Sequence, residues 1–356
     1  MPSLATFLIA GGIYGLAFGV FDPAQLAWII DIWRHDAGPY ILSLYFFYSC
    51  GNLIAPLILE PFLLDDKNTT DSDNSSTTTV SPSEISTELP LVKENSQLYI
   101  PFAIAGGIML SGTIIELALL LYYRNRNPKK TSVVIAAPEN SQPNETQIGK
   151  ISGRAKIVII VIACFFNSFY QSMEVNTLQF ASVFAQSSPI QLTEREGSRV
   201  LSAMTFGFAI GRGVGIFLVL KIQPHLILIG NLVLLLLGNT LLFTLGGTSV
   251  EWMWAGAICL GLGLSTTIAA FFAYLEKYIF ISDRVAAFTS VGVGLMISVY
   301  PLVLGKWIED FPKLLNYCDY LNITVLVIAF GLLFRLTRYN KRESTAFKQD
   351  TELKFE

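Results

Sequence analysis

The stretch GVFDPAQLAWIIDIW, residues 19–33, places an Asp-Pro pair inside a run of apolar and small residues. A carboxylate near the centre of a membrane helix costs about 2.5–3.5 kcal/mol and usually faces a polar interior. Pro23 also leaves one backbone carbonyl without its usual N–H donor. The stretch predicts a membrane-spanning helix in which Asp22 either serves function or, when protonated or paired, only fixes helix packing.

The composition extends this interpretation to the whole chain. Of 356 residues, 52% are hydrophobic and 14% are charged, and the mean hydropathy is +0.53. Soluble domains carry about 25% charged residues, so the chain has a membrane-protein composition. A net charge of −3 argues against a nucleic-acid partner. The four cysteines form no C-x-x-C pair and the two histidines lie far apart, so neither a metal site nor a bound cofactor is predicted.

Apolar runs of about 20 residues, the length that crosses a bilayer, recur along the chain. They predict an all-α polytopic membrane protein with nine transmembrane helices, surrounded by lipid. The predicted helices are approximately 4–32, 40–63, 98–123, 155–186, 198–221, 224–246, 252–278, 284–307 and 314–337.

Two polar segments interrupt this series. Residues 64–97 are acidic and rich in Ser and Thr, which is typical of a disordered loop, and they hold glycosylation sequons at Asn68 and Asn74. Residues 124–154 are basic, and Lys and Arg accumulate on the cytoplasmic side of membranes. The first loop is therefore expected outside the cell, where its sequons would make the protein a glycoprotein, and the second inside.

These loops divide the chain into parts. Residues 1–123 form a partial N-terminal half of three helices, and residues 124–154 form a cytoplasmic linker. Residues 155–337 form a C-terminal half of six helices, and residues 338–356 form a cytoplasmic tail.

This arrangement resembles the major facilitator superfamily without its first three helices, because that superfamily joins two six-helix halves by a cytoplasmic loop. Several segments are similar to the sodium-dependent glucose transporter 1 family, which is related to the fucose permeases. The matching positions are Gly19, Asp22, Trp33 and Pro56 in the first two spans, Glu174 in YQSMEVNTLQFASVFA, Gly211 and Arg212 in FGFAIGRGVGIFLVLKIQPH, Ser265 and Glu276 in GLGLSTTIAAFFAYLEKYI, and Gly292, Gly294, Met296, Pro301 and Gly305 in AAFTSVGVGLMISVYPLVLGKW.

The resemblance implies a multi-pass carrier of the plasma membrane that moves glucose or a similar hexose by sodium or proton symport. It implies that Asp22 and Glu174 respond to the coupling ion. Leu26, Tyr45 and Phe206 depart from the family pattern at positions expected to line the sugar cavity, so the resemblance does not fix the identity of the solute. Two rivals remain: a passive facilitator of a small neutral solute, and a truncated membrane protein that transports nothing.

A polar stripe surrounds Glu174. Polar residues recur there at spacings of three and four, which places them on one face of a helix. Together with Gln25 and Ser265, they are predicted to hold the solute, although an interhelical hydrogen-bond seam worth about 0.6 kcal/mol per contact is the alternative. The members are Asn167, Tyr170, Gln171, Glu174 and Thr177.

Arg212 lies in the middle of its predicted span and needs an anionic partner or a path to water. Glu174 is the nearest candidate by depth, and snorkelling toward the cytoplasm is the alternative. Glycines at four-residue spacing predict close helix packing in two spans, at positions 11, 15 and 19 and at positions 207, 211 and 215. No Ser-His-Asp set or nucleotide-binding loop is present, so no enzyme is predicted.

Overall fold

A computed structural model describes residues 4–33, 37–62, 99–126, 153–275, 278 and 283–352. Within α1 (Leu4–Trp33) the side chains of Asp22 and Pro23 fall outside the described part, although their backbone is helical. Asn68, Asn74 and almost all of the linker also lie outside the described residues. The membrane orientation therefore stays a prediction.

The described residues are almost entirely helical, and none of them forms a strand. The all-α prediction is confirmed. After α1, the elements are α2 (Ala37–Leu59), the short 3-10 helix η2 (Glu60–Phe62), α3 (Tyr99–Arg126), α4 (Gly153–Ser187), α5 (Glu194–Lys221), α6 (Pro224–Thr244), α7 (Val250–Ser265), α8 (Thr267–Leu275), α9 (Asp283–Trp307) and α10 (Lys313–Glu352).

Each predicted span coincides with a helix, and α7 and α8 together fill a single predicted span. In the described part of the chain, seven helical segments are long and apolar enough to cross a membrane, while α1 holds only a shorter apolar stretch, Leu8–Phe21. The predicted number of nine is thus reached by counting helices and not by this stricter criterion. Multiple membrane passes follow from either count.

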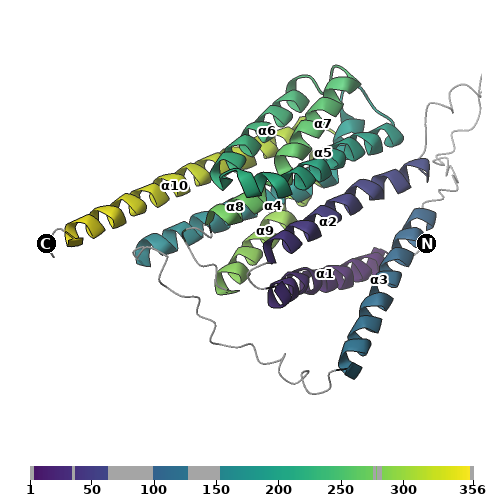
Figure 1. The fold of residues 1–356 in the computed structure, drawn as a ribbon. Helices are drawn as coiled ribbons and strands as arrows, with labels where there is room; N and C mark the ends of the chain where they lie inside the picture. Colours follow the sequence, from purple (N-terminus) through teal and green to yellow (C-terminus); the bar gives the residue numbers. More distant parts are fainter. Residues whose placement is uncertain are drawn as a thin grey trace, which may run out of the picture.

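Two helix ends differ from the apolar runs that predicted them. Helix α5 begins at Glu194, before the predicted start at 198, because Thr193 and Glu196 form a capping box that satisfies its first N–H groups. Helix α10 continues to Glu352, well past the end of its apolar run at 337. Figure 1 shows its C-terminal part projecting beyond the bundle.

The core lies in a bundle formed by α4 to α10. Helix α4 packs against α5, α9 and α10, and α7 packs against α5 and α6. Large buried side chains of α4 and α8, such as Phe166 and Phe271, stack at the centre with ring centroids 4.0 Å apart. From the N-terminal part of the chain, α2 packs along α5, and α1 packs against α2 (Figure 1).

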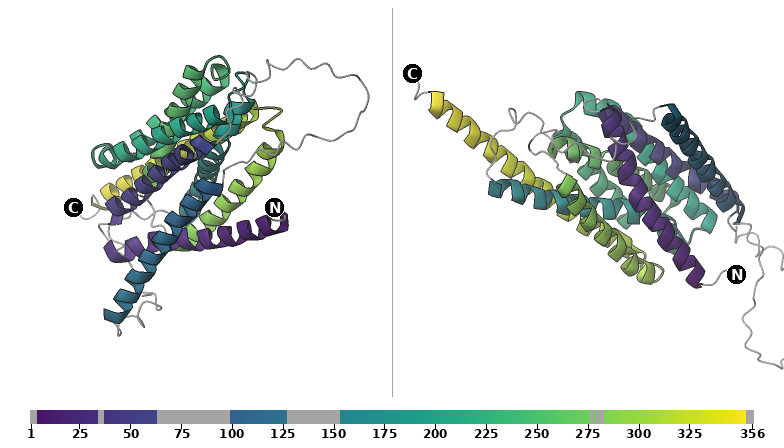
Figure 2. Two further views of the ribbon diagram at one scale, coloured as in Figure 1. Left: turned by 90° about the vertical axis from the view of Figure 1, so that its right-hand side faces the viewer. Right: turned by 90° about the horizontal axis from the view of Figure 1, so that it is seen from below.

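Helix α3 lies outside this bundle, along the edge of the fold in the right-hand view of Figure 2. None of the apolar window in its span, Tyr99–Tyr122, is buried inside the protein. Exposed apolar surface of this extent is unusual for a protein in water, but it is what a lipid-facing helix presents. The surface is therefore consistent with a membrane-spanning helix.

Glycine explains how closely α5 approaches α7. A Cβ atom on Gly207 would lie 2.6 Å from the carbonyl oxygen of Ile258, and one on Gly211 would lie 2.5 Å from Ser265 Cβ. The close packing predicted for this glycine row is confirmed. The prediction for the α1 row is wrong in this structure, because positions 11, 15 and 19 have no atom within 4 Å of an added Cβ; the principal contacts of α1 are with α2.

Candidate functional site

A break between α7 and α8 supplies backbone acceptors inside the bundle. The Ser265 hydroxyl donates to the carbonyl of Leu262 at 2.6 Å, and the Thr267 hydroxyl donates to the carbonyl of Gly263 at 2.7 Å. Such bonds from Ser and Thr to preceding carbonyls bend helices. With the regular ladder interrupted at Thr266, the carbonyls of nearby residues can accept from side chains of other helices.

Tyr170 on α4 occupies the centre of this region. Its side chain is fully buried, and its hydroxyl donates to Glu174 Oε2 at 2.6 Å. The same hydroxyl contacts the carbonyl oxygen of Leu264 at the end of α7. A phenol has a single proton, so the two oxygens compete for one donor.

Arg212 of α5 completes the arrangement from the opposite side. It is 6% exposed, its Nη2 lies 3.1 Å from Glu174 Oε1, and its Nε donates to the carbonyl of Ser265 at 3.2 Å. The guanidinium carbon lies 4.0 Å from the ring centroid of Phe208, a distance at which a cation is attracted by the ring face. The buried charge is therefore paired and hydrogen-bonded, as burial requires.

The same guanidinium also reaches helix α2. Its Nη1 donates to the carbonyl of Tyr45 at 3.0 Å and to the hydroxyl of Ser49 at 3.1 Å. The Ser49 hydroxyl in turn donates to the Tyr45 carbonyl at 2.8 Å. We call this set the Arg212 cluster; it consists of Arg212, Glu174, Tyr170, Ser49 and the carbonyls of Tyr45, Leu264 and Ser265.

The ion pair that the sequence suggested between Arg212 and Glu174 is present. The guanidinium reaches toward α4 and α2 instead of snorkelling to a membrane face. Among the other predicted residues, Ser265 contributes its carbonyl to the cluster, while its hydroxyl bonds within its own helix. Gln25 is partly exposed on α1, and the roles of Asp22 and Pro23 stay predictions.

The rest of the polar stripe separates into different surroundings. Asn167 is buried, and within the described part of the chain its Oδ1 has no hydrogen-bond partner. Gln171 is partly exposed. Thr177 is turned away from the Arg212 cluster and donates to Asp319 of α10 at 3.0 Å. The structure thus brings Tyr170 and Glu174 together and places Thr177 in a second polar site.

Sequence reasoning missed Ser49, Phe208 and Asp319, and it named Tyr45 only as a departure from the family pattern at a position expected to line the sugar cavity. Asp319 carried a usable signal, since it is a lone carboxylate within the predicted span 314–337. The contribution of Tyr45 comes from its backbone carbonyl, and that of Ser49 from a hydroxyl among many in the chain. No residue pattern marks either of them.

A second polar contact joins α2 to α5 near one end of both helices. Glu60 Oε1, in η2 just after α2, lies 2.7 Å from Arg199 Nε and 3.4 Å from Arg195 Nε. The Ser198 hydroxyl donates to the carbonyl of Pro56 at 3.3 Å. Helix α2 is consequently held to α5 at two depths, here and at the Arg212 cluster.

Comparisons with known proteins identify the family of this fold. The family model of the Major Facilitator Superfamily matches residues 1–301. A sodium-dependent glucose transporter 1 of Danio rerio is 28% identical over 328 residues, covering 90% of this chain and 53% of the relative. One of Homo sapiens is 25% identical over 308 residues, covering 85% of this chain and 56% of the relative. No solved structure matches the chain.

The chain spans about half the length of these two curated relatives. Their names confirm the resemblance found in the sequence and agree with the prediction of a transporter instead of an enzyme. With the match to 301 of 356 positions, together with its apolar helices, this chain is a multi-pass membrane protein that belongs to the major facilitator superfamily.

Proposed function

We propose that this chain acts in secondary-active transport of glucose or a similar hexose across the plasma membrane, coupled to sodium or protons. The names of the relatives supply the solute class and the sodium dependence. The observation that carries the proposal is the Arg212 cluster, in which a buried ion pair of the C-terminal half also hydrogen-bonds to α2 of the N-terminal part. Ionisable residues inside a membrane fold mark solute and ion pathways.

The contacts of Arg212 with both halves could change during alternating access. Carriers of this kind rock one half against the other around a central site. Arg212 holds partners on both sides: Glu174 and the Ser265 carbonyl in the C-terminal half, and α2 in the N-terminal part. Separation of α2 from α5 would remove two acceptors from the guanidinium and leave donors that hydroxyl groups of a sugar can satisfy.

The single proton of Tyr170 offers a route for coupling. When Glu174 is ionised, the Tyr170 hydroxyl donates to it at 2.6 Å. When Glu174 carries a proton, the carboxyl can donate to Tyr170 instead, and Tyr170 can then donate fully to the Leu264 carbonyl. A change of charge on Glu174 would therefore be passed to the break between α7 and α8. Asp22 is proposed as the second ion-responsive carboxylate.

The test is uptake of radiolabelled glucose by cells expressing this chain, measured against external sodium at two pH values. We expect Glu174→Gln to lower solute affinity more than ion dependence, because its helix carries the polar stripe and Asp22 remains to respond to the ion. We expect Asp22→Asn to lose gradient-driven accumulation while keeping some exchange of solute. Glu251→Gln, at an exposed carboxylate near the start of α7, is the matched control.

Each rival has its own outcome. If counterflow of solute through the unmodified chain is independent of the sodium and proton gradients, the passive facilitator is favoured. Absence of uptake, with the chain present at the cell surface, would favour a membrane protein without transport activity. If Asp22→Asn accumulates solute with unchanged dependence on sodium and pH, the role proposed for that carboxylate is wrong.

A further inference from the structure

A second buried carboxylate lies outside the Arg212 cluster. Asp319 of α10 is 2% exposed, and the Thr177 hydroxyl donates to its Oδ1 at 3.0 Å. None of the ion pairs found among the described residues includes Asp319. An ionised carboxylate without a cation is costly to bury. The carboxyl therefore either holds a proton or pairs with a positive charge that the described side chains do not supply.

A buried amide oxygen points to where that charge would be. Asn316, one turn before Asp319, is 1% exposed, and its Oδ1 has no hydrogen-bond partner among the residues that the structure describes. Its orientation is fixed by Asn239 of α6: Asn316 Nδ2 donates to Asn239 Oδ1 at 2.8 Å, and Asn239 Nδ2 donates to the Asn316 carbonyl at 3.0 Å. With the nitrogen held by Asn239, the Asn316 oxygen must face the other way.

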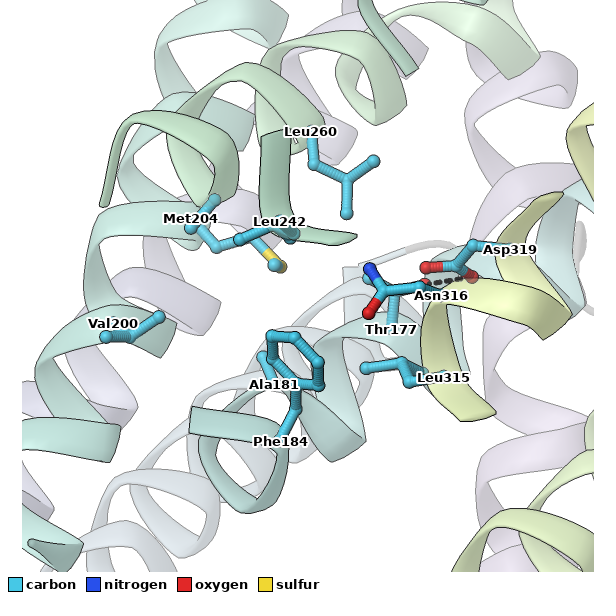
Figure 3. Close-up of a pocket in the computed structure, with 11 residues that line it drawn as sticks. Thr177, Ala181, Phe184, Val200, Met204, Leu242, Leu260, Leu315, Asn316 and Asp319 are labelled. Carbon is cyan, nitrogen blue, oxygen red and sulfur yellow. Dashed lines mark hydrogen bonds between the residues drawn. The ribbon is translucent and has the colours of Figure 1, made fainter. Parts of the chain in front are cut away.

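The oxygen faces a small cavity that Asp319 and Thr177 also line. Figure 3 shows the Asn316 amide and the Asp319 carboxylate side by side on α10, across from Thr177 and Phe184 of α4. The cavity volume is about 10 Å³, and the remaining walls are mainly apolar side chains of α4 to α7 and α10. A cavity needs roughly 10–15 Å³ to hold one water molecule, so this one has room for a single small particle.

We propose that this cavity is a binding site for one sodium-sized monovalent cation. Its ligands are a carboxylate oxygen of Asp319, Oδ1 of Asn316 and the hydroxyl oxygen of Thr177. Hard cations prefer such oxygen ligands. The Thr177 hydroxyl donates its proton to Asp319 and keeps its lone pairs for the ion. One positive charge balances the one carboxylate, which selects a monovalent ion over a divalent one.

A route to the site exists at one end of the bundle. A second cavity, of about 190 Å³, is lined by the loops that precede α7 and α10, and it shares Phe184 and Leu242 with the small cavity. These two side chains separate the larger cavity from Asp319. Lys313 also lines the larger cavity, where its ammonium lies 5.1 Å from the ring centroid of Phe243. We expect an ion to enter through motion of Phe184 and Leu242, the two side chains that line both cavities.

The test measures sodium binding directly, so that it is independent of transport. The full chain is purified in detergent, and its thermal unfolding is followed in sodium chloride and in choline chloride at constant ionic strength. A ligand that binds only the folded state raises the unfolding temperature with concentration. We expect sodium to raise the unfolding temperature of the unmodified chain. We also expect saturable binding of radioactive sodium to the unmodified chain and loss of that binding in Asp319→Asn.

Three variants make the result specific. Asp319→Asn keeps the shape of the carboxylate and should lose the sodium response. Thr177→Val, which tests the site if Asp319→Asn does not fold, should weaken sodium affinity by about tenfold, the effect of one lost polar ligand. Glu251→Gln, at an exposed carboxylate near the start of α7, should keep the response.

Two outcomes overturn the proposal. One is stabilisation that rises as the pH falls and is equal in sodium and choline, which would assign the cavity to a proton. The other is a sodium response that survives in Asp319→Asn. A chain that transports nothing but shows the expected sodium response would refute the proposed function alone and leave the sodium site intact.

Discussion

Replacement of Arg212 by methionine tests whether the Arg212 cluster is held together by its charge. Arg212→Met keeps an unbranched apolar stem against Phe208 but removes the cation that lies 3.1 Å from Glu174 Oε1. At that distance, Coulomb's law with an effective dielectric constant of about 20 gives an attraction of about 5 kcal/mol. Both residues are 6% exposed, so water does not replace the lost partner.

The expected loss of unfolding free energy is about 3–5 kcal/mol, the range found when one member of a buried ion pair is removed. The double variant Glu174→Gln with Arg212→Met removes both charges and leaves Tyr170 an acceptor. It should recover at least about half of the loss, because replacing a whole buried pair is often close to neutral. Unfolding is measured by denaturant titration in mixed micelles, followed by tryptophan fluorescence.

Lys221→Met is the matched control, since Lys221 is an exposed cation at the end of the same helix. Its effect should stay within about 0.5 kcal/mol. If the double variant is no more stable than Arg212→Met alone, the two side chains are not coupled, and the electrostatic account of the cluster is refuted. A loss below 1 kcal/mol for Arg212→Met would show that the guanidinium is solvated.

Three further outcomes follow from the fold. Glycans should attach at Asn68 or Asn74, in the loop expected outside the cell, and not at the sequon Asn144 in the linker expected inside. Enzymatic deglycosylation of variants that lack each sequon measures this, and a glycan at Asn144 would show the reverse orientation. Gly207→Ala should cost about 1–3 kcal/mol by forcing α5 from α7, whereas Gly230→Ala, which meets open space, should be neutral or stabilising in the same titration. Glu60→Gln should increase the chemical labelling of cysteines introduced at the contact between α2 and α5, because the two helices separate more often. It should change the free energy of unfolding by no more than about 1 kcal/mol. Unchanged labelling would contradict a role of Glu60 in holding these helices together.

The helices could be predicted from sequence because apolar length is a local property. A bilayer leaves no water for backbone groups, so runs such as 224–246 had to be helices whatever their neighbours. The ends were less predictable: the capping box at Thr193 and Glu196 begins α5 earlier than its apolar run, and the charged extension of α10 carries no apolar signal. Caps and solvated helices depend on hydrogen bonds that hydropathy does not report.

Apolar length and isolated charges, both visible in the sequence, predict a multi-pass helical protein of the major facilitator superfamily. They also predict that Arg212 and Glu174 lie at similar depth and need partners. A charge inside a membrane helix requires compensation, and that requirement can be read from one residue and its apolar surroundings.

Only the tertiary structure decided which partners meet. It gave Arg212 the carbonyls of Tyr45 and Ser265, and it turned Thr177 away from Glu174 toward Asp319. Backbone carbonyls are identical in every residue, and whether one is free depends on a break in its own helix and on which helix packs against it. Helices distant in sequence supply these contacts, so no local pattern encodes them.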